Sequence, residues 1–325
     1  MTKQIMVGGV PIGGGAPVTI QSMTNTRTDD VEDTLHQIRT LAAAGCEIIR
    51  VAVPDMAAAK AVGKIKEESP IPVVVDIHFD YKLALEAIAA GADKVRINPG
   101  NIGGADHVKA VAQACARRGV PIRIGVNGGS LEKPLLAKYG GVCPAAMVES
   151  AFGHIRLLNQ FDFDDICVSL KSSSVPMTMK AYRLMSQASD YPLHIGVTEA
   201  GTVRMGTLKS AVGIGGLLAL GIGDTMRVSL SADPVEEIYA AKEILKAAGV
   251  RKEGAELVSC PTCGRTRIDL IALANEVEER LKAVDKPITV AVMGCVDNGP
   301  GEASAADCGI AGGVGEGLLF KKGQI

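Results

Sequence analysis

The sequence contains no tryptophan, and it has only five phenylalanines and five tyrosines among 325 residues. A surface that stacks nucleic-acid bases needs aromatic side chains, and this chain has few. Charge of one sign is not in excess either, because 34 Lys and Arg oppose 36 Asp and Glu, for a net charge of −2. Since that balance gives no bulk attraction to nucleic acid, we expect no nucleic-acid partner.

Long hydrophobic runs are also missing. The longest Gly/apolar stretch, 212–222, is too short to cross a bilayer and is interrupted by glycines. The first residues, MTKQIMVGGVPIGGG, do not join a basic segment to an apolar run as a signal peptide does. We therefore expect a cytoplasmic protein with no membrane partner.

A strand-like run followed by a helix-like segment recurs eight times. The β-branched runs are VTIQSMT (18–24), EIIRVAVP (47–54), PVVVDIHF (72–79), KVRINPGN (94–101), PIRIGVN (121–127), DICVSLKSS (165–173), PLHIGVTEA (192–200) and DTMRVSL (224–230). Eight such units predict an α/β fold, a (β/α)8 TIM barrel, with a doubly wound open sheet as the alternative. The glycine-rich VGGVPIGGGAPVT precedes the first run, so we expect a hairpin that closes the barrel floor, not a phosphate loop.

The repeat ends near Gly249. One helix-like segment, one strand-like run and a glycine-rich tail follow it. We expect a barrel domain over residues 1–250 that binds the substrate and a small α+β domain over residues 251–325. A domain as small as the second often needs a metal or another covalent support to fold.

Four cations lie at the ends of strand-like runs, namely Arg50, Arg96, Arg123 and Lys171. The active site of a TIM barrel is built at the carboxyl ends of its strands. Arginine offers a fork of donors that suits phosphate oxygens, so the set predicts a compact phosphorylated ligand. The alternative is that these cations form structural ion pairs, and Asp76 is one available partner.

Other polar side chains share these positions: Asn98, Asn127, Thr198, Glu199, His78 and His194. Glu199 is a candidate proton donor or acceptor, although a carboxylate among cations should stay ionised and could equally serve to position the substrate. The two histidines are either proton shuttles or hydrogen-bonded interior residues.

The eight cysteines fall into two groups. Cys46, Cys115, Cys143 and Cys167 lie in apolar or helical segments and are expected to be buried, reduced thiols. The others, Cys260, Cys263, Cys295 and Cys308, lie in the last quarter of the chain with Glu302 among them.

Three cysteines beside glycine-rich turns favour an iron–sulfur cluster over zinc, because the second Cys-x-x-Cys pair of a zinc site is missing. The fourth ligand stays open at this point. Cys308 would close the cluster for electron transfer, whereas Glu302 would leave one iron with an exchangeable oxygen ligand.

The motifs VGGVPIGGGAPVTIQSMTNT, IIRVAVP, VRINPGN, IRIGVN, GVTEAG, CPTCGRT and MGCVDNGPGE resemble those of the bacterial 4-hydroxy-3-methylbut-2-enyl diphosphate synthases, over essentially the whole chain. The resemblance implies reductive ring opening and dehydration of 2-C-methyl-D-erythritol 2,4-cyclodiphosphate in the non-mevalonate isoprenoid pathway. It also implies a [4Fe–4S] cluster, reduced flavodoxin or ferredoxin as electron donor, and a head-to-tail homodimer.

Carried onto this sequence, the resemblance implies that Cys260, Cys263, Cys295 and Glu302 hold the cluster. It implies substrate contacts from Arg50, Arg96, Asn98, Arg123, Asn127, Lys171 and Thr198, with Glu199 and Glu302 as catalytic residues. Two rival functions remain: a phosphate- or pterin-binding TIM-barrel transferase with a zinc-stabilised C-terminal module, and an electron carrier or metal-sensing module without catalysis.

Overall fold

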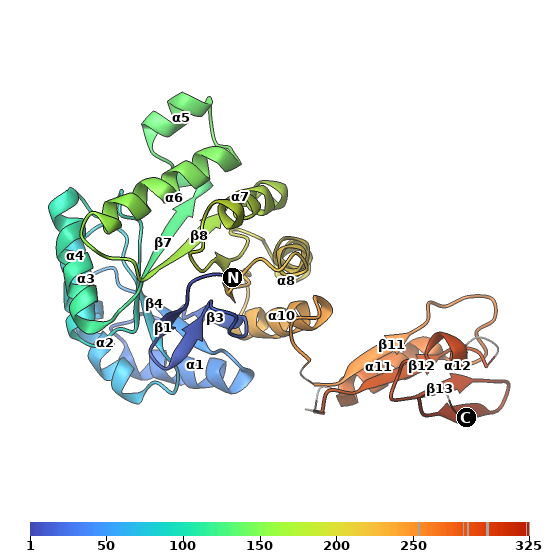
Figure 1. Ribbon diagram of the computed structural model, residues 1–325. Helices are drawn as coiled ribbons and strands as arrows, with labels where there is room; N and C mark the ends of the chain where they lie inside the picture. The colour runs from blue at the N-terminus through green and yellow to red at the C-terminus, as the bar shows by residue number, and fades with distance from the viewer. Residues whose placement is uncertain (253, 282, 285, 297–298, 323, 325) are drawn as a thin grey trace. The chain divides into compact units, whose positions relative to one another are not determined.

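The computed structural model describes residues 1–252, 254–281, 283–284, 286–296, 299–322 and 324. The chain divides into two compact units, Met1–Val250 and Arg251–Ile325 (Figure 1). The first unit contains an eight-stranded sheet and a two-stranded hairpin, and the second contains a four-stranded sheet.

Eight parallel strands form the sheet of the first unit, in the order β8-β7-β6-β5-β4-β3-β10-β9. Their bounds are β3 (Thr19–Met23), β4 (Ile48–Ala52), β5 (Val73–Asp76), β6 (Lys94–Ile97), β7 (Ile122–Asn127), β8 (Ile166–Lys171), β9 (His194–Ile195) and β10 (Thr225–Met226). A bridge from Val168 to Leu193 brings the two ends of this order together. The predicted (β/α)8 barrel is confirmed, and the open-sheet alternative is wrong.

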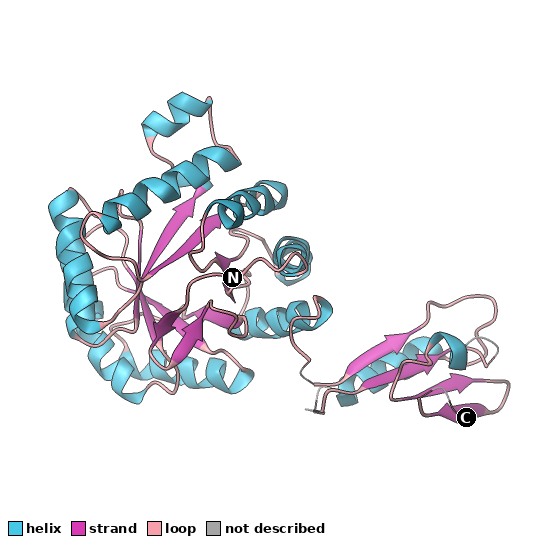
Figure 2. Ribbon diagram, in the orientation of Figure 1, coloured by secondary structure: helices cyan, strands magenta, loops and turns pink. Residues whose placement is uncertain are grey.

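Helices surround these strands (Figure 2). They are α1 (Val31–Ala44), α2 (Met56–Glu68), α3 (Tyr81–Ala89), α4 (Ala105–Arg118), α5 (Lys133–Tyr139), α6 (Pro144–Asn159), α7 (Val175–Ala188), α8 (Val203–Ser210), α9 (Gly216–Leu218) and α10 (Pro234–Ala247). A 3-10 turn, η1 (Gly128–Ser130), follows β7, and a π-helical turn, η2 (Ala211–Gly215), joins α8 to α9. Asp30 and Asp55 accept backbone N–H bonds at the starts of α1 and α2, and Gly45 ends α1 in the left-handed conformation that favours glycine.

Alternation along each strand decides which side chains enter the barrel. On β4, Ile49 and Val51 belong to the main apolar core under the helices. Arg50 lies between them and therefore points the other way, into the barrel. The same alternation on β6 and β7 sends Arg96 and Arg123 inward, since their neighbours along each strand are buried in the outer core.

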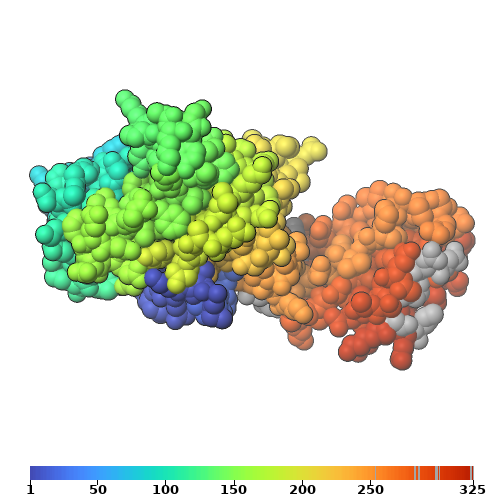
Figure 3. All heavy atoms as spheres, turned by 45° about the horizontal axis from the view of Figure 1, so that its top comes forward, coloured from blue at the N-terminus to red at the C-terminus, as the bar shows by residue number. Residues whose placement is uncertain are grey.

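The N-terminal segment forms the expected hairpin of β1 (Ile5–Val7) and β2 (Val10–Ile12). Its apolar side chains pack with inward residues near the amino ends of three barrel strands: Ile5, Val7, Ile12, Ile48, Val74 and Cys167. The hairpin therefore closes the barrel floor, and the N-terminal residues form a blue patch on the barrel surface in Figure 3.

The second unit contains β11 (Glu256–Ser259), α11 (Leu270–Leu281), β12 (Thr289–Met293), α12 (Gly299–Glu302), β13 (Cys308–Gly312) and β14 (Gly317–Phe320). The sheet order follows the chain, with β11, β12 and β13 parallel and β14 antiparallel to β13. Because β11 and β12 are parallel neighbours, the loops after them leave the same edge of the sheet.

Candidate functional site

The barrel register brings the predicted cations together. Arg50 pairs with Met23 of β3 in one direction and Val74 of β5 in the other. Arg96 lies opposite both Asp76 and Arg123, and Asn127 lies opposite Lys171. Arg50, Arg96 and Lys171 lie at the centres or carboxyl ends of β4, β6 and β8, whereas Arg123 is the second residue of β7 and enters the barrel lower down. All four side chains belong to the barrel interior.

Asp76 is the carboxylate at the centre of this group. It accepts a 2.9 Å hydrogen bond from Arg96 Nη1, while Arg50 Nε lies 3.7 Å and His78 Nε2 3.6 Å from its other oxygen. Burial alone would raise the pKa of Asp76, but the bond from His78 and the charges of Arg50 and Arg96 outweigh it and hold the pKa well below its usual range. Asp76 is therefore an ionised structural partner.

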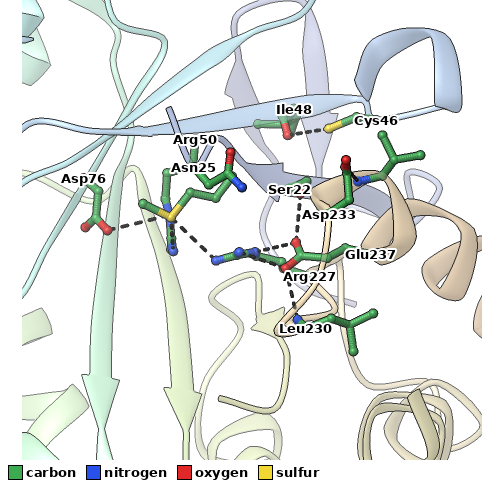
Figure 4. Close-up of polar contacts among 12 residues, drawn as sticks. Ser22, Asn25, Cys46, Ile48, Arg50, Asp76, Arg227, Leu230, Asp233 and Glu237 are labelled. Carbon is green, nitrogen blue, oxygen red and sulfur yellow. Dashed lines mark hydrogen bonds and ion pairs between the residues drawn. The ribbon is translucent and has the colours of Figure 1, made fainter. Parts of the chain in front are cut away.

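A fifth cation, Arg227, completes the ring and was missed in the sequence. Its guanidinium forms two bonds with Glu237 of α10, at 3.0 and 3.1 Å (Figure 4). Met23 Sδ lies between two guanidinia, 2.9 Å from Arg50 Nη2 and 3.6 Å from Arg227 Nη1. The signal was present, since Met226-Arg227-Val228 repeats the arginine between two apolar residues that occurs in the other strands.

Two further cations, Arg123 and Lys171, lack carboxylate partners among the described residues. Arg123 is 1% exposed, and its Nε and Nη1 have no hydrogen-bond partner among the described residues. Burial and then the charge of Arg96 lower its pKa to about 10. Burial and then Arg123 also lower the pKa of Lys171 well below its usual value. Buried, unpaired cations of this kind are stabilised when an anion binds among them.

Glycine makes room for one of these cations. A Cβ atom built on Gly196 would lie 2.8 Å from Lys171 Nζ, closer than real Cβ contacts allow. The glycine of the GVTEAG motif therefore leaves the space that the Lys171 ammonium occupies.

The other predicted barrel residues lie at the same end of the barrel. Asn98 is buried just after β6 and accepts a hydrogen bond from the backbone of Gly100, while Asn127 is half-buried and ends β7. Thr198 is half-buried after β9. Glu199 is exposed and has a φ of 52°, a conformation that non-glycine residues adopt at a cost.

The two histidines differ in their surroundings. His78 is largely exposed beside Asp76. His194 is fully buried, and burial followed by the charge of Arg123 lowers its pKa well below the usual value. His194 is therefore a neutral interior residue and not a proton shuttle.

Three thiols lie along one edge of the second unit. Cys260 follows β11, Cys295 follows β12, and Cys260 Sγ accepts a hydrogen bond from the Gly294 backbone at 3.2 Å. Hydrogen bonds from the backbone and side chain of Arg265 lower the pKa of Cys263. The bond to Cys263, the charges of Cys263 and Cys295 and, more weakly, Glu302 raise the pKa of Arg265.

This donor set fits an iron–sulfur group in its chemistry. It offers three thiols and one carboxylate, and a backbone N–H already reaches one sulfur, as is usual around such clusters. Within the described ranges, no three His, Cys, Asp or Glu side chains converge as a metal site. The donors share one edge of the sheet but are not gathered around one point.

Cys308 is wrongly placed for the fourth ligand. It begins β13 opposite Val290, whereas Cys295 lies two residues beyond Met293, the last residue of β12. At about 3.3 Å per residue, Val290 and Met293 are already about 10 Å apart along the strand, and Cys295 lies past that end. The alternative of a cluster closed by Cys308 therefore fails because the two cysteines lie at opposite ends of parallel neighbours.

The fold and the site define a class: a TIM-barrel protein with an anion-binding interior and a separate cysteine-bearing domain. Residues 2–242 match the GcpE TIM-barrel domain, and residues 256–325 match the GcpE protein C-terminal domain. The 4-hydroxy-3-methylbut-2-en-1-yl diphosphate synthase (flavodoxin) of Geobacter sulfurreducens is 63% identical over 324 residues, which cover 100% of this chain and 92% of that protein. The Bacillus subtilis protein of the same name is 58% identical over 324 residues, covering 100% of this chain and 86% of that one.

The chain thus belongs to the GcpE family of 4-hydroxy-3-methylbut-2-enyl diphosphate synthases. This confirms the resemblance that its motifs carry and, with it, the prediction of an oxidoreductase of isoprenoid synthesis. The alternative of a pterin-binding transferase is not favoured.

Solved structures of low identity share the barrel. A dihydropteroate synthase of Yersinia pestis aligns with 77% of this chain and 100% of its own, at a TM-score of 0.54 and 13% identity. The N-acetylneuraminic acid synthetase of Leptospira borgpetersenii aligns with 86% of this chain and 97% of its own, at a TM-score of 0.53 and 14% identity. At such identities the likeness concerns the fold alone. Among the described residues, no helix combines the length and apolarity that a membrane span requires.

Proposed function

We propose that this chain converts 2-C-methyl-D-erythritol 2,4-cyclodiphosphate into 4-hydroxy-3-methylbut-2-enyl diphosphate. The observation that carries the proposal is the cation excess inside the barrel. Among the described residues, Asp76 and Glu237 contact Arg50, Arg96 and Arg227, while Arg123 and Lys171 have no carboxylate partner. The five cations exceed the two carboxylates by three, and a cyclic diphosphate supplies two negative charges in a compact ring, which offsets most of that excess.

The barrel residues would bind and orient this substrate. Arg123 and Lys171 would neutralise the diphosphate, and the amides of Asn98 and Asn127 would add hydrogen bonds at the rim. The reaction takes up two electrons and two protons, breaks the ring C–O bond at C2 and releases the C3 hydroxyl as water. Glu199 would deliver a proton there or steady the developing charge, since it lies beside Thr198 at the same end of the barrel.

Cys260, Cys263, Cys295 and Glu302 would hold a [4Fe–4S] cluster. Such a cluster supplies single electrons, and Glu302 would give it one ligand that exchanges more readily than a thiolate. The relatives carry flavodoxin in their names, so we propose reduced flavodoxin as the electron donor, with ferredoxin as the alternative.

We propose further that two chains pair head to tail and share each active site. The last barrel helix, α10, runs antiparallel to the strands, so the chain leaves the barrel near its floor, at the end opposite the cations. A second chain could supply the cysteine domain that faces each barrel, with two-fold closure. Mixing inactive Cys295→Ser with inactive Lys171→Ala protein should then restore activity under subunit exchange. No recovery despite demonstrated exchange would contradict the shared site.

The proposed function is tested by anaerobic turnover of the full chain with reduced flavodoxin. The cyclodiphosphate should disappear and the linear diphosphate should form. Cys295→Ser protein should bind the substrate but form no product. Product formation by Cys295→Ser protein, or failure of the wild-type barrel to bind the cyclodiphosphate, would overturn the proposal.

A further inference from the structure

Below the anion-binding cations, the barrel interior is polar where a TIM barrel usually packs branched apolar side chains. Several of these buried side chains have polar atoms without a hydrogen-bond partner among the described residues. They are Thr19, Gln21, Lys94 and His194. Lys94 is the least expected of them, because it is fully buried and its Nζ has no such partner.

The position of Lys94 follows from the register of β6. Lys94 precedes Arg96 by two residues, so both side chains face inward and are about 6.6 Å apart along the strand. Lys94 lies opposite Val74, which packs against the floor hairpin. The side chain of Lys94 therefore enters the buried barrel interior at the level of the floor, below the position of Arg96 on the same strand.

The charged and titratable groups around Lys94 come from every neighbouring part of the ring. Arg123 of β7, Arg50 of β4 and His194 of β9 interact electrostatically with Lys94. The thiol of Cys167 on β8 also interacts with it. Asp76 of β5 is already bonded to Arg96 and paired with Arg50. Among the described residues, the one carboxylate named here, Asp76, is therefore engaged by arginines, and no ion pair with Lys94 is formed.

A further positive charge among these arginines is unfavourable in the free protein. Burial lowers the pKa of Lys94 to about 7; Cys167 opposes this, and the charges of Arg123 and Arg50 add smaller decreases. Burial raises the pKa of Cys167, so the thiol does not supply a balancing anion at neutral pH. At and above neutral pH, a neutral amine is the stable form in the free protein.

We propose that Lys94 is a positioning residue of the barrel site, and that its buried amine takes up a proton when a diphosphate binds to the arginines above it. The inference rests on the proposed function, since it needs an anionic ligand at Arg123. Two negative charges near Arg123 and Arg50 remove the repulsion that adds to the cost of charging this buried amine, and they attract the ammonium directly. The resulting ammonium then adds to the attraction that holds the diphosphate in the barrel.

The proposal is tested by isothermal titration of the full, cluster-loaded chain with the cyclodiphosphate, without reductant, in buffers of different ionisation enthalpy. A cyclic diphosphate lacks the phosphate ionisation near pH 6 that monoesters have, so its own charge stays constant. Wild-type protein should take up nearly one proton per ligand at about pH 8, and Kd should rise up to tenfold per pH unit above pH 7. Lys94→Met, of similar shape, should bind without proton uptake and with a flat pH profile.

Histidine titrates between about pH 5 and 8, so His78→Asn is the matched control and should keep the proton uptake of the wild type. Uptake that persists in Lys94→Met or vanishes in His78→Asn would overturn the inference while leaving the diphosphate site intact. Absence of any binding would instead overturn the proposed function and the inference with it.

A second measurement follows the amine itself. In wild-type protein labelled with ¹³Cε-lysine, the signal that is missing from the spectrum of Lys94→Met should titrate near pH 7 in the free protein and stay protonated to higher pH with the cyclodiphosphate bound. If that signal does not titrate below pH 9 in the free protein, the inference is wrong.

Discussion

The Arg96 guanidinium occupies the space that a side chain at position 125 would fill. A Cβ atom built on Gly125 would lie 2.6 Å from Arg96 Nε, which is closer than real Cβ contacts allow. Gly125 is on β7 and faces the same interior as Arg123. Because Gly125 has no side chain, the Arg96 guanidinium can lie in the position from which it donates a hydrogen bond to Asp76. The glycine of the IRIGVN motif therefore has a steric role in the site.

Gly125→Ala should displace Arg96 from its position beside Asp76 and weaken cyclodiphosphate binding. Losing a charge-assisted contact costs about 1.5–3 kcal/mol, so Kd should rise about tenfold or more in calorimetry. Gly129→Ala is the matched control, because its Cβ would meet no atom within 4 Å. Equal affinities for the two variants would remove the steric argument.

Arg123→Ala should weaken binding of the cyclodiphosphate while the visible spectrum of the cluster domain stays unchanged. Because Arg123 has two unpartnered donors, its removal deletes ligand contacts without freeing a carboxylate. The expected loss in affinity is at least about tenfold. Arg39→Ala, which removes an exposed ion pair with Glu68, should bind as wild type does. Unchanged affinity in Arg123→Ala would exclude Arg123 from the site.

Asp76→Asn should destabilise the barrel at pH 7, because it removes a buried carboxylate from among cations. The free energy of unfolding should fall by about 3–5 kcal/mol. The pKa of Asp76 in the folded protein lies below its unfolded value, so its stabilising effect is present at neutral pH and is lost as the pH falls below about 4.

The difference in unfolding free energy between wild type and Asp76→Asn should therefore shrink by about 1.4 kcal/mol per pH unit below about pH 4. Denaturant titrations between pH 7 and 2.5 measure this difference. Inorganic pyrophosphate should restore part of the stability of Asp76→Asn, since it returns negative charge to the same cations. A difference that does not change with pH would contradict the ionised state of Asp76.

Serine at Cys260, Cys263 or Cys295 should abolish visible absorption and activity together. Cys308→Ser is the matched control and should keep both, because Cys308 begins β13 at the far end of the sheet from Cys295. Iron and sulfide analysis of anaerobically purified variants checks this. Loss of the cluster in Cys308→Ser, with full iron and turnover in Glu302→Ala, would contradict the assignment of Glu302 as the fourth ligand.

The barrel was predictable because its signals are local. Each strand of β-branched residues buries its outer side chains under a helix, and an arginine that interrupts such a run must face inward. Arg227 was missed because its strand, β10, has only two residues, so the arginine lies just past the strand and not within it. Glu237 could not be found from sequence, since its role depends on how α10 packs beside β3.

Placement within the second domain was less predictable. Cys308 follows Glu302 by six residues, and this short separation suggested a nearby ligand. Glu302 is the last residue of α12, and the chain after it returns to the start of a parallel strand, which carries Cys308 to the other end of the sheet. Sequence separation does not reveal such a crossing. The charge state of Lys94 was equally hidden, because it depends on four strands at once.

The central claim is that an anion-binding barrel and a cysteine-held cluster together reduce a cyclic diphosphate. A single-turnover experiment with chemically reduced, iron- and sulfide-loaded full chain tests it most directly, because electrons and product are counted in the same sample. The account predicts two electrons consumed for each 4-hydroxy-3-methylbut-2-enyl diphosphate formed, with none formed by Arg123→Ala at substrate concentrations well below its Kd. Full reduction and substrate binding without any linear diphosphate would contradict the account.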